Sequence, residues 1–270
     1  MEVRLVSQKI LSELKKWFAD YVETFRSDDP DYQLNIDLKE KHTRLVCEGI
    51  IDIGESLALN EDDLRLAEVT ALFHDVGRFE QYARYGSFLD MRTENHALLG
   101  VRILRTNHIF DDIDEETREL IFYAIANHNR ACLTNNGSER HLFFTKLLRD
   151  ADKLDIWRVV TEYYHSNNGK RNGALELDLP DTPEISELVY MDLMKRNIVK
   201  AEHLKNLNDF KLLQIGWVYD VNFARTLQLV CERKYIEKIY NALPKSEKVL
   251  EIYKAVQDYL EKKCGYVEMN

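Results

Sequence analysis

The stretch ALFHDVGRFEQ (71–81) carries the strongest local signal in the chain. The apolar residues Val69, Leu72 and Phe73 precede an adjacent histidine and aspartate, His74 and Asp75. A buried carboxylate without a charged partner costs several kcal/mol or gives up its charge. A bound cation removes this cost, and His with Asp is a mixed nitrogen and oxygen ligand set that suits Fe, Mn, Zn or Ni. The pair therefore indicates either a metal site or a polar helix end.

Three further histidines lie on the apolar stripes of predicted helices: His42, His96 and His128. Each is separated from apolar neighbours by three, four or seven residues, the spacing of one helix face. A single histidine of this kind is more often an ordinary core residue. Three of them beside a buried His-Asp pair leave many polar groups to satisfy in one core, and convergence on metal ions satisfies them together.

An acidic run follows in KLLRDADKLDIW (146–157), with Asp150, Asp152 and Asp155 on one predicted helix. Such a run is usually a solvated face. The apolar neighbours, such as Leu154 and Trp157, indicate that at least one acid turns inward. Spacing alone does not select which one.

The order His42, HDVGR (74–78), His96, His128 and RDADKLD (149–155) resembles the HD-domain phosphohydrolase superfamily. The full series looks like the dinuclear branch, which includes the HD-GYP phosphodiesterases and the diadenosine-tetraphosphate hydrolases. The resemblance covers roughly residues 30 to 160, and HDxGR combined with a later DADKLD is quite specific. It implies an all-α HD-domain helical bundle. No GYP triplet follows His128, so hydrolysis of cyclic-di-GMP is not supported.

Carried over by position, the resemblance implies that one divalent transition metal (Fe, Mn, Ni, Co or Zn) is held by four residues, His42, His74, Asp75 and Asp152. Asp75 then bridges to a second ion held by His96 and His128. The usual ligand of the family is the aspartate before the lysine of an Asp-Lys pair, which selects Asp152.

Three other polar residues acquire roles from the same resemblance. Asp150 becomes a candidate for orienting a ligand histidine. Arg78 and Lys153 are expected to meet the charge of a substrate phosphate, so that Asp75, Arg78 and Lys153 form the predicted catalytic set.

The implied activity is hydrolysis of a phosphomonoester or phosphodiester of a small molecule, preferably a nucleotide, by a metal-bound hydroxide. Two alternatives stay open. The same ligands occur in di-iron oxygenases that resemble inositol oxygenase, and an HD scaffold can also serve as a non-catalytic ligand sensor.

Composition agrees with a helical, cytoplasmic protein. The chain has 270 residues, of which only 10 are Gly and 4 are Pro, and this scarcity disfavours an all-β fold. A net charge of -10 argues against general nucleic-acid binding, while a small phosphorylated substrate remains compatible. The four cysteines form no CxxC pair, so neither a zinc ribbon nor a redox dithiol is indicated. No signal peptide or membrane span is predicted.

The chain is expected to divide into an HD phosphohydrolase domain with an N-terminal helix (1–165) and a helical extension (166–270), because 166–186 holds two glycines and two prolines. The extension covers the site or mediates a homodimer. Asn60, Thr93 and Asp114 are predicted helix N-caps. Residues 76–92 are predicted to form a loop, whose aromatic residues Tyr82, Tyr85 and Phe88 wall a pocket or pack the loop onto the core.

Overall fold

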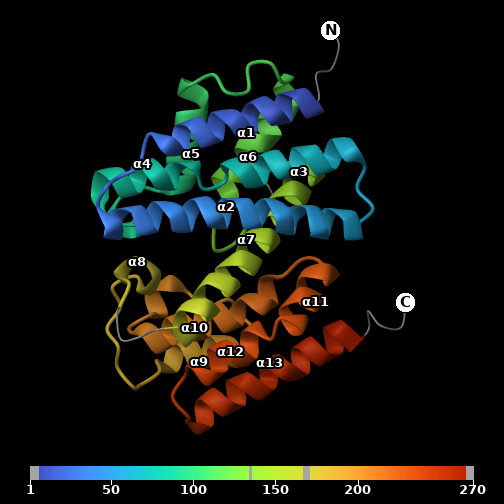
Figure 1. Cartoon of the computed structure of the whole chain (residues 1–270). Coiled ribbons are helices and arrows are strands. Elements are labelled where there is room, and N and C mark those ends of the chain that lie inside the picture. Colours follow the sequence, from blue (N-terminus) through green and yellow to red (C-terminus); the bar gives the residue numbers. More distant parts are fainter. Residues whose placement is uncertain (1–5, 134–135, 167–170, 266–270) are drawn as a thin grey trace. The chain divides into compact units, whose positions relative to one another are not determined.

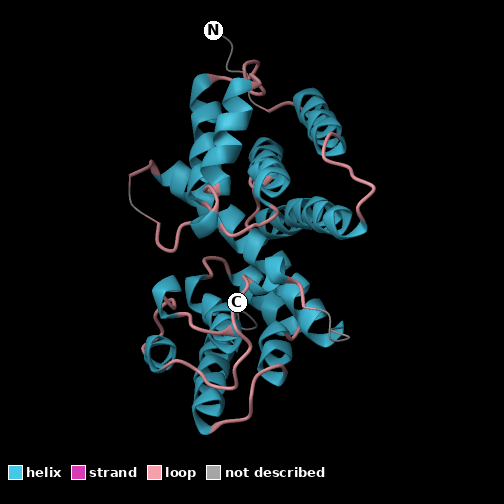
Figure 2. Ribbon diagram, turned by 90° about the vertical axis from the view of Figure 1, so that its left-hand side faces the viewer, coloured by secondary structure: helices cyan, strands magenta, loops and turns pink. Residues whose placement is uncertain are grey.

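The computed structural model describes residues 6–133, 136–166 and 171–265, and every regular element within these ranges is a helix (Figures 1 and 2). This confirms the predicted all-α fold. The chain divides into two compact units, Met1–Asp155 and Ile156–Asn270. The division lies inside one long helix, α7 (Glu139–Ser166), upstream of the expected boundary at residue 165. Each unit is described separately below.

The first unit is a helical bundle. Its helices are α1 (Gln8–Glu23), α2 (Pro30–Ser56), α3 (Glu61–Phe73), α4 (Val76–Tyr85), α5 (His96–Thr106), α6 (Glu115–Asn127) and the first part of α7, with a short 3-10 turn, η1 (Asp90–Arg92). Helices α2 and α3 pack along each other, and α4 packs on α5 (Figure 1). Helix α3 also contacts α1 and α6, so it is central to the unit.

Side-chain N-caps were predicted for three of these helices. Asn60 accepts from the backbone N–H of Asp63 at 2.9 Å, and Asp114 accepts from that of Thr117 at 3.0 Å, as expected. The prediction of Thr93 as the cap of α5 is wrong. Asn95 caps this helix by accepting from the N–H of Leu98 at 3.0 Å.

The prediction that residues 76–92 form a loop is also wrong for their first half, because Val76–Tyr85 is helix α4. This helix buries Val76, Gly77, Phe79 and Gln81 on one face. A glycine and a glutamine occupy inward positions where an apolar residue would reveal the helical period. Gly86, in the left-handed conformation with φ 62°, ends the helix.

Aromatic packing positions the turn between α3 and α4. Phe73 ends α3, Phe79 lies on α4, and both rings meet Phe18 of α1 edge-on, at centroid distances of 6.2 and 5.8 Å. Phe73 and Phe79 are fully buried. Such edge-to-face contacts add about 0.5–1.5 kcal/mol each beyond the burial of apolar area. The junction that carries His74 and Asp75 is therefore anchored on both sides.

Gly77 is required by the packing of α4 against α5. A Cβ atom at this position would meet the backbone oxygen of His96, and would lie 2.7 Å from the backbone nitrogen of Gly100. Both are main-chain atoms and cannot rotate away. The glycine of the HDVGR motif thus lets α4 approach the first turn of α5, where His96 is located.

The second unit comprises the last part of α7 and a series of shorter helices. They are α8 (Gly173–Glu176), α9 (Glu187–Met194), α10 (Leu207–Gly216), α11 (Ala224–Glu232), α12 (Tyr235–Asn241) and α13 (Glu247–Gly265), with two 3-10 turns, η2 (Ala201–His203) and η3 (Trp217–Asp220). The indole of Trp157 is fully buried and donates to the backbone oxygen of Gln214 at 2.8 Å. Helix α13 packs against α9 and α11. Across the ranges given above, no helix is long and apolar enough to cross a membrane.

We expect Gly77→Ala to lower the free energy of unfolding by roughly 1–3 kcal/mol, because the methyl group collides with fixed backbone. Gly49→Ala on α2 is the matched control. Its Cβ would make only an ordinary contact with Ala151 at 3.9 Å, and alanine favours a helix by up to about 1 kcal/mol. Chemical denaturation followed by circular dichroism measures both. Equal stability of the two variants would contradict this role for Gly77.

Candidate metal centre

The structure brings together the six residues predicted as metal ligands, from five separate segments. His42 lies in the middle of α2, His74 and Asp75 lie at the junction of α3 and α4, and His96 is the first residue of α5. His128 caps the C-terminal end of α6, and Asp152 lies on α7. All six belong to the first unit. We refer to them below as the six-residue cluster.

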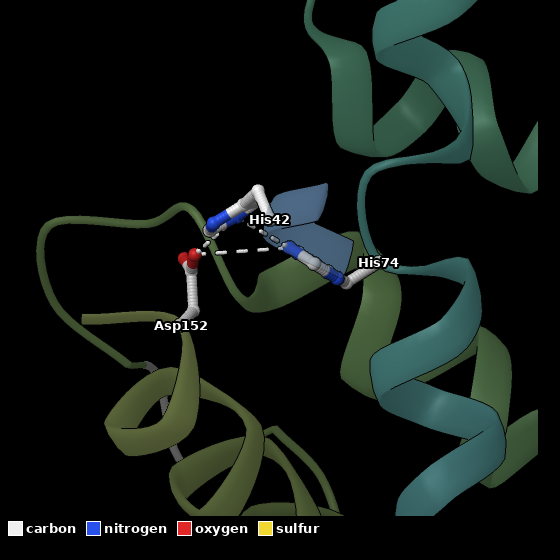
Figure 3. Close-up of side chains that lie close together, drawn as sticks. All are labelled: His42, His74 and Asp152. Atoms are coloured by element: carbon white, nitrogen blue, oxygen red, sulfur yellow. Dashed lines mark hydrogen bonds and ion pairs between the residues drawn. The ribbon is translucent and has the colours of Figure 1, made fainter. Parts of the chain in front are cut away.

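One half of the cluster consists of His42, His74 and Asp152, which point toward one another (Figure 3). The Nε2 atoms of the two histidines are 3.3 Å apart. Asp152 Oδ1 lies 3.1 Å from Nε2 of His42 and 3.7 Å from Nε2 of His74. Ligand atoms about 2.1 Å from one ion are separated by roughly 3.0–3.4 Å. The spacing of this half is close to that of a metal ligand set.

The other half consists of His96 and His128. Their Nε2 atoms are 3.1 Å apart, and they lie 3.2 and 3.9 Å from Oδ1 of Asp75. The second oxygen of Asp75, Oδ2, faces the first half, at 3.6 Å from Nε2 of His42 and 3.7 Å from Nε2 of His74. The two oxygens of one carboxylate therefore face two different pairs of histidines.

Each imidazole is held by a hydrogen bond from its other nitrogen, Nδ1. His74 and His128 donate to the backbone oxygens of Ala71 and Ile125, both at 2.7 Å. The Nδ1 atoms of His42 and His96 lie 2.7 Å from carboxylate oxygens of Asp155 and Asp90. All four rings thus present Nε2 to the interior of the cluster, which is the arrangement found in metal-binding histidines.

The protonation of His74 and His128 leaves a lone pair on the Nε2 atom of each ring. A carbonyl oxygen only accepts, so Nδ1 of each ring must carry the proton. Burial lowers the pKa of both rings, to about 3 for His128, so they are neutral and their Nε2 atoms are bare acceptors. These acceptors face other imidazoles and carboxylates. A cation satisfies such a group of lone pairs, and the donor set therefore fits a divalent metal.

The surroundings of His42 also favour positive charge. Burial and Lys39 act to lower the pKa of its imidazole, but contacts with Asp152 and Asp155 outweigh them and raise it to about 9. Asp75 and Asp152 remain ionised. Burial acts to raise the pKa of each carboxyl, but Lys39 and a hydrogen bond with His96 at Asp75, and a hydrogen bond with His42 at Asp152, hold it well below its usual range.

Three neighbours of the cluster were not identified as site residues in the sequence. We expected Asp150 to orient a ligand histidine, and Asp155 makes this contact with His42. Asp90, in the short turn η1, holds His96. Lys39 places its Nζ 2.7 Å from Oδ2 of Asp75. Lys39 lies three residues before His42 on α2, and this helical spacing is the one signal that relates it to the site.

Arg78 and Lys153, predicted to meet a substrate phosphate, have different surroundings. Nε of Arg78 lies 3.5 Å from Oδ1 of Asp75 and has no hydrogen-bond partner, whereas its Nη1 donates to Asp90 at 2.9 Å and to the backbone oxygen of Phe88. Arg78 therefore contacts the cluster and also fixes the segment that positions Asp90. Lys153 is buried beside Asp152 on α7.

The aromatic residues after the HD motif mainly pack their own segment. Phe88 is buried and stacks on Tyr82 with ring centroids 4.7 Å apart, while Tyr85 is exposed. Nζ of Lys39 lies 5.3 Å from the centroid of Phe88, so this ring also supports the cation beside Asp75.

Comparison with known families identifies this part of the chain. Residues 40–157 match the family described as HD domain, a segment that contains all six members of the cluster as well as Asp90 and Asp155. Searches of curated proteins and of solved structures returned no significant match. HD domains bind divalent metals, and the family consists generally of metal-dependent hydrolases. The segment 40–157 is therefore an HD domain.

Proposed function

We propose that this HD domain hydrolyses a phosphomonoester or phosphodiester of a small molecule, and that the substrate is a nucleotide. The observation that carries the proposal is the convergence of four Nε2 atoms on the two oxygens of Asp75. The nucleotide preference rests on the resemblance to the dinuclear branch of the superfamily. The net charge of -10 supports a small substrate rather than a nucleic-acid polymer.

We assign the six-residue cluster to two divalent transition-metal ions. His42, His74, Asp75 and Asp152 would hold one, and Asp75, His96 and His128 the other. The charge of the site favours cations. The four carboxylates Asp75, Asp90, Asp152 and Asp155 outnumber the two nearby cationic side chains, Lys39 and Arg78. When metal ions supply positive charge to the carboxylates, Lys39 and Arg78 would also be able to attract a phosphate.

When bound, such ions supply an activated water at neutral pH and neutralise charge on the reacting phosphate. The residues of the chain orient the four imidazoles and exclude water from most of the cluster. Asp155 and Asp90 fix two imidazoles, and the backbone oxygens of Ala71 and Ile125 fix the other two. Within the cluster the side chain of Asp152 is 16% exposed, against 4% or less for the other five, so substrate would approach from its side. Lys39 and Arg78, each about one-sixth exposed, lie near Asp75.

We expect His74→Ala and Asp75→Ala to lose bound metal and phosphate release together, because each removes donors from the centre of the cluster. Elemental analysis of the purified chain, with a phosphate-ester screen in Mn, Fe, Co and Ni, measures both. His108→Ala is the matched control, because this histidine is 75% exposed and pairs with Asp111. Full metal content in either cluster variant would refute the ligand assignment. Dioxygen consumption without phosphate release would replace hydrolysis with oxygenation.

Asp155→Asn should weaken metal binding by about 10- to 100-fold, since it removes the charge that orients His42. Asp111→Asn is the control, because its carboxylate lies 3.0 Å from the exposed His108, outside the site. Competition with a chelator measures the affinity. Unchanged affinity in Asp155→Asn would show that the ring of His42 is held without this contact.

Lys39→Ala and Lys153→Ala should retain metal and lower kcat/KM by about 10- to 100-fold, the effect of losing a charged hydrogen bond to phosphate. Lys41→Ala, an exposed position on the same helix as Lys39, should be neutral. Steady-state kinetics on the best substrate of the screen, with metal content measured in parallel, test this. Loss of metal in either variant would instead assign that lysine a structural role in the cluster.

A further inference from the structure

Two cysteines of the second unit lie in contact although 33 residues separate them. Cys231 is near the end of α11 and Cys264 near the end of α13, and their Sγ atoms are 3.0 Å apart. Helices α11 and α13 pack against each other. The contact therefore joins the end of the last helix to an earlier helix of the same unit.

The surroundings of this thiol pair differ from those of the other cysteines. Cys231 is exposed and Cys264 is half-buried, so a dissolved reagent can reach them. Cys47 is buried, and Cys132 is exposed but is not paired with another cysteine. A disulfide bond is about 2.05 Å long, so the two sulfur atoms need to approach by only about 1 Å to bond. Small side-chain rotations provide such a movement.

We propose that Cys231 and Cys264 form a reversible disulfide site, with a small-molecule disulfide such as oxidised glutathione as the oxidant. One cysteine thiolate attacks a sulfur of the oxidant, and the first glutathione thiolate leaves. The second cysteine thiolate then attacks the sulfur of the first cysteine in this mixed disulfide, and the second glutathione thiolate leaves. The two protein thiols lose two electrons and two protons, and the oxidant is reduced to two molecules of glutathione.

The rate of this reaction should be low at neutral pH. Burial and the neighbouring Cys264 thiol raise the pKa of Cys231 to about 12, so its thiolate is scarce. Because the fraction of thiolate grows as the pH rises toward this pKa, cross-linking should be faster at alkaline pH. Once one cysteine carries glutathione, the adjacent sulfur displaces it without a bimolecular encounter, which favours the internal bond over a lasting adduct.

The disulfide would anchor the C-terminal end of α13. It closes a loop that contains α12 and most of α13 and so restricts the unfolded chain. For a loop of this length, the expected rise in Tm of the unit is on the order of 10–15 °C. The feature involves neither the metal cluster nor the HD domain match, so it stands independently of the proposed hydrolysis.

The test uses the full chain with Cys132→Ser, which removes the other exposed thiol. After incubation with oxidised glutathione, intact mass should fall by two hydrogen atoms, and peptide mapping should link residues 231 and 264. The Tm should rise and return to its original value with dithiothreitol. In the added single variants Cys231→Ser and Cys264→Ser, the remaining cysteine should keep one glutathionyl group and the Tm should not rise.

Three outcomes would overturn the proposal. They are two free thiols after prolonged incubation at pH 8–9, a glutathionyl group on each cysteine, or a covalent dimer in place of the internal cross-link. A cross-link that leaves the Tm unchanged would refute the anchoring of α13.

Discussion

The carboxylate of Asp75 is the contact on which the rest of the HD domain depends. Its two oxygens face different pairs of histidines, and those histidines come from four helices or helix ends. A buried anion in this position is stable because Lys39, His96 and Arg78 hold its pKa low. The same concentration of lone pairs and negative charge that would destabilise a core creates a site for cations. The cluster is therefore a place where the packing of the core is less favourable to folding than apolar side chains would be, but is suited to binding cations.

Close backbone packing around the α3–α4 junction makes this arrangement possible. The rings of Phe73 and Phe79 fix the junction against α1, and Gly77 allows α4 to reach the first turn of α5. His96 is the first residue of that turn. The HDVGR motif therefore combines two members of the six-residue cluster with the glycine that brings a third member close. Its residues belong together for steric reasons as much as for chemical ones.

Periodicity was enough to predict the helical fold, the inward direction of His42, His96 and His128, and two of three caps. It was insufficient where packing determines the outcome. Helix α4 was missed because Gly77 and Gln81 occupy its buried face. Asp155 was not singled out for its contact with His42, although Asp152 and Asp155, three residues apart, share one face of α7. Asp90 was missed because it lies in the short turn η1, six residues before His96, where the period of an α-helix does not apply. The Cys231–Cys264 contact depends on tertiary neighbours, which no spacing along the chain reveals.

The hydrogen bonds that orient the four imidazoles differ greatly in the number of residues that separate the two partners in the sequence. His74 and His128 bond to carbonyls three residues earlier, and His96 to an acid six residues earlier. His42 bonds to Asp155, 113 residues away. During folding, three rings can acquire their orientation as soon as their local turns form, whereas the fourth must wait until α7 docks on α2. Orientation of all four rings is therefore coupled to the docking of α7, the last helix of the domain.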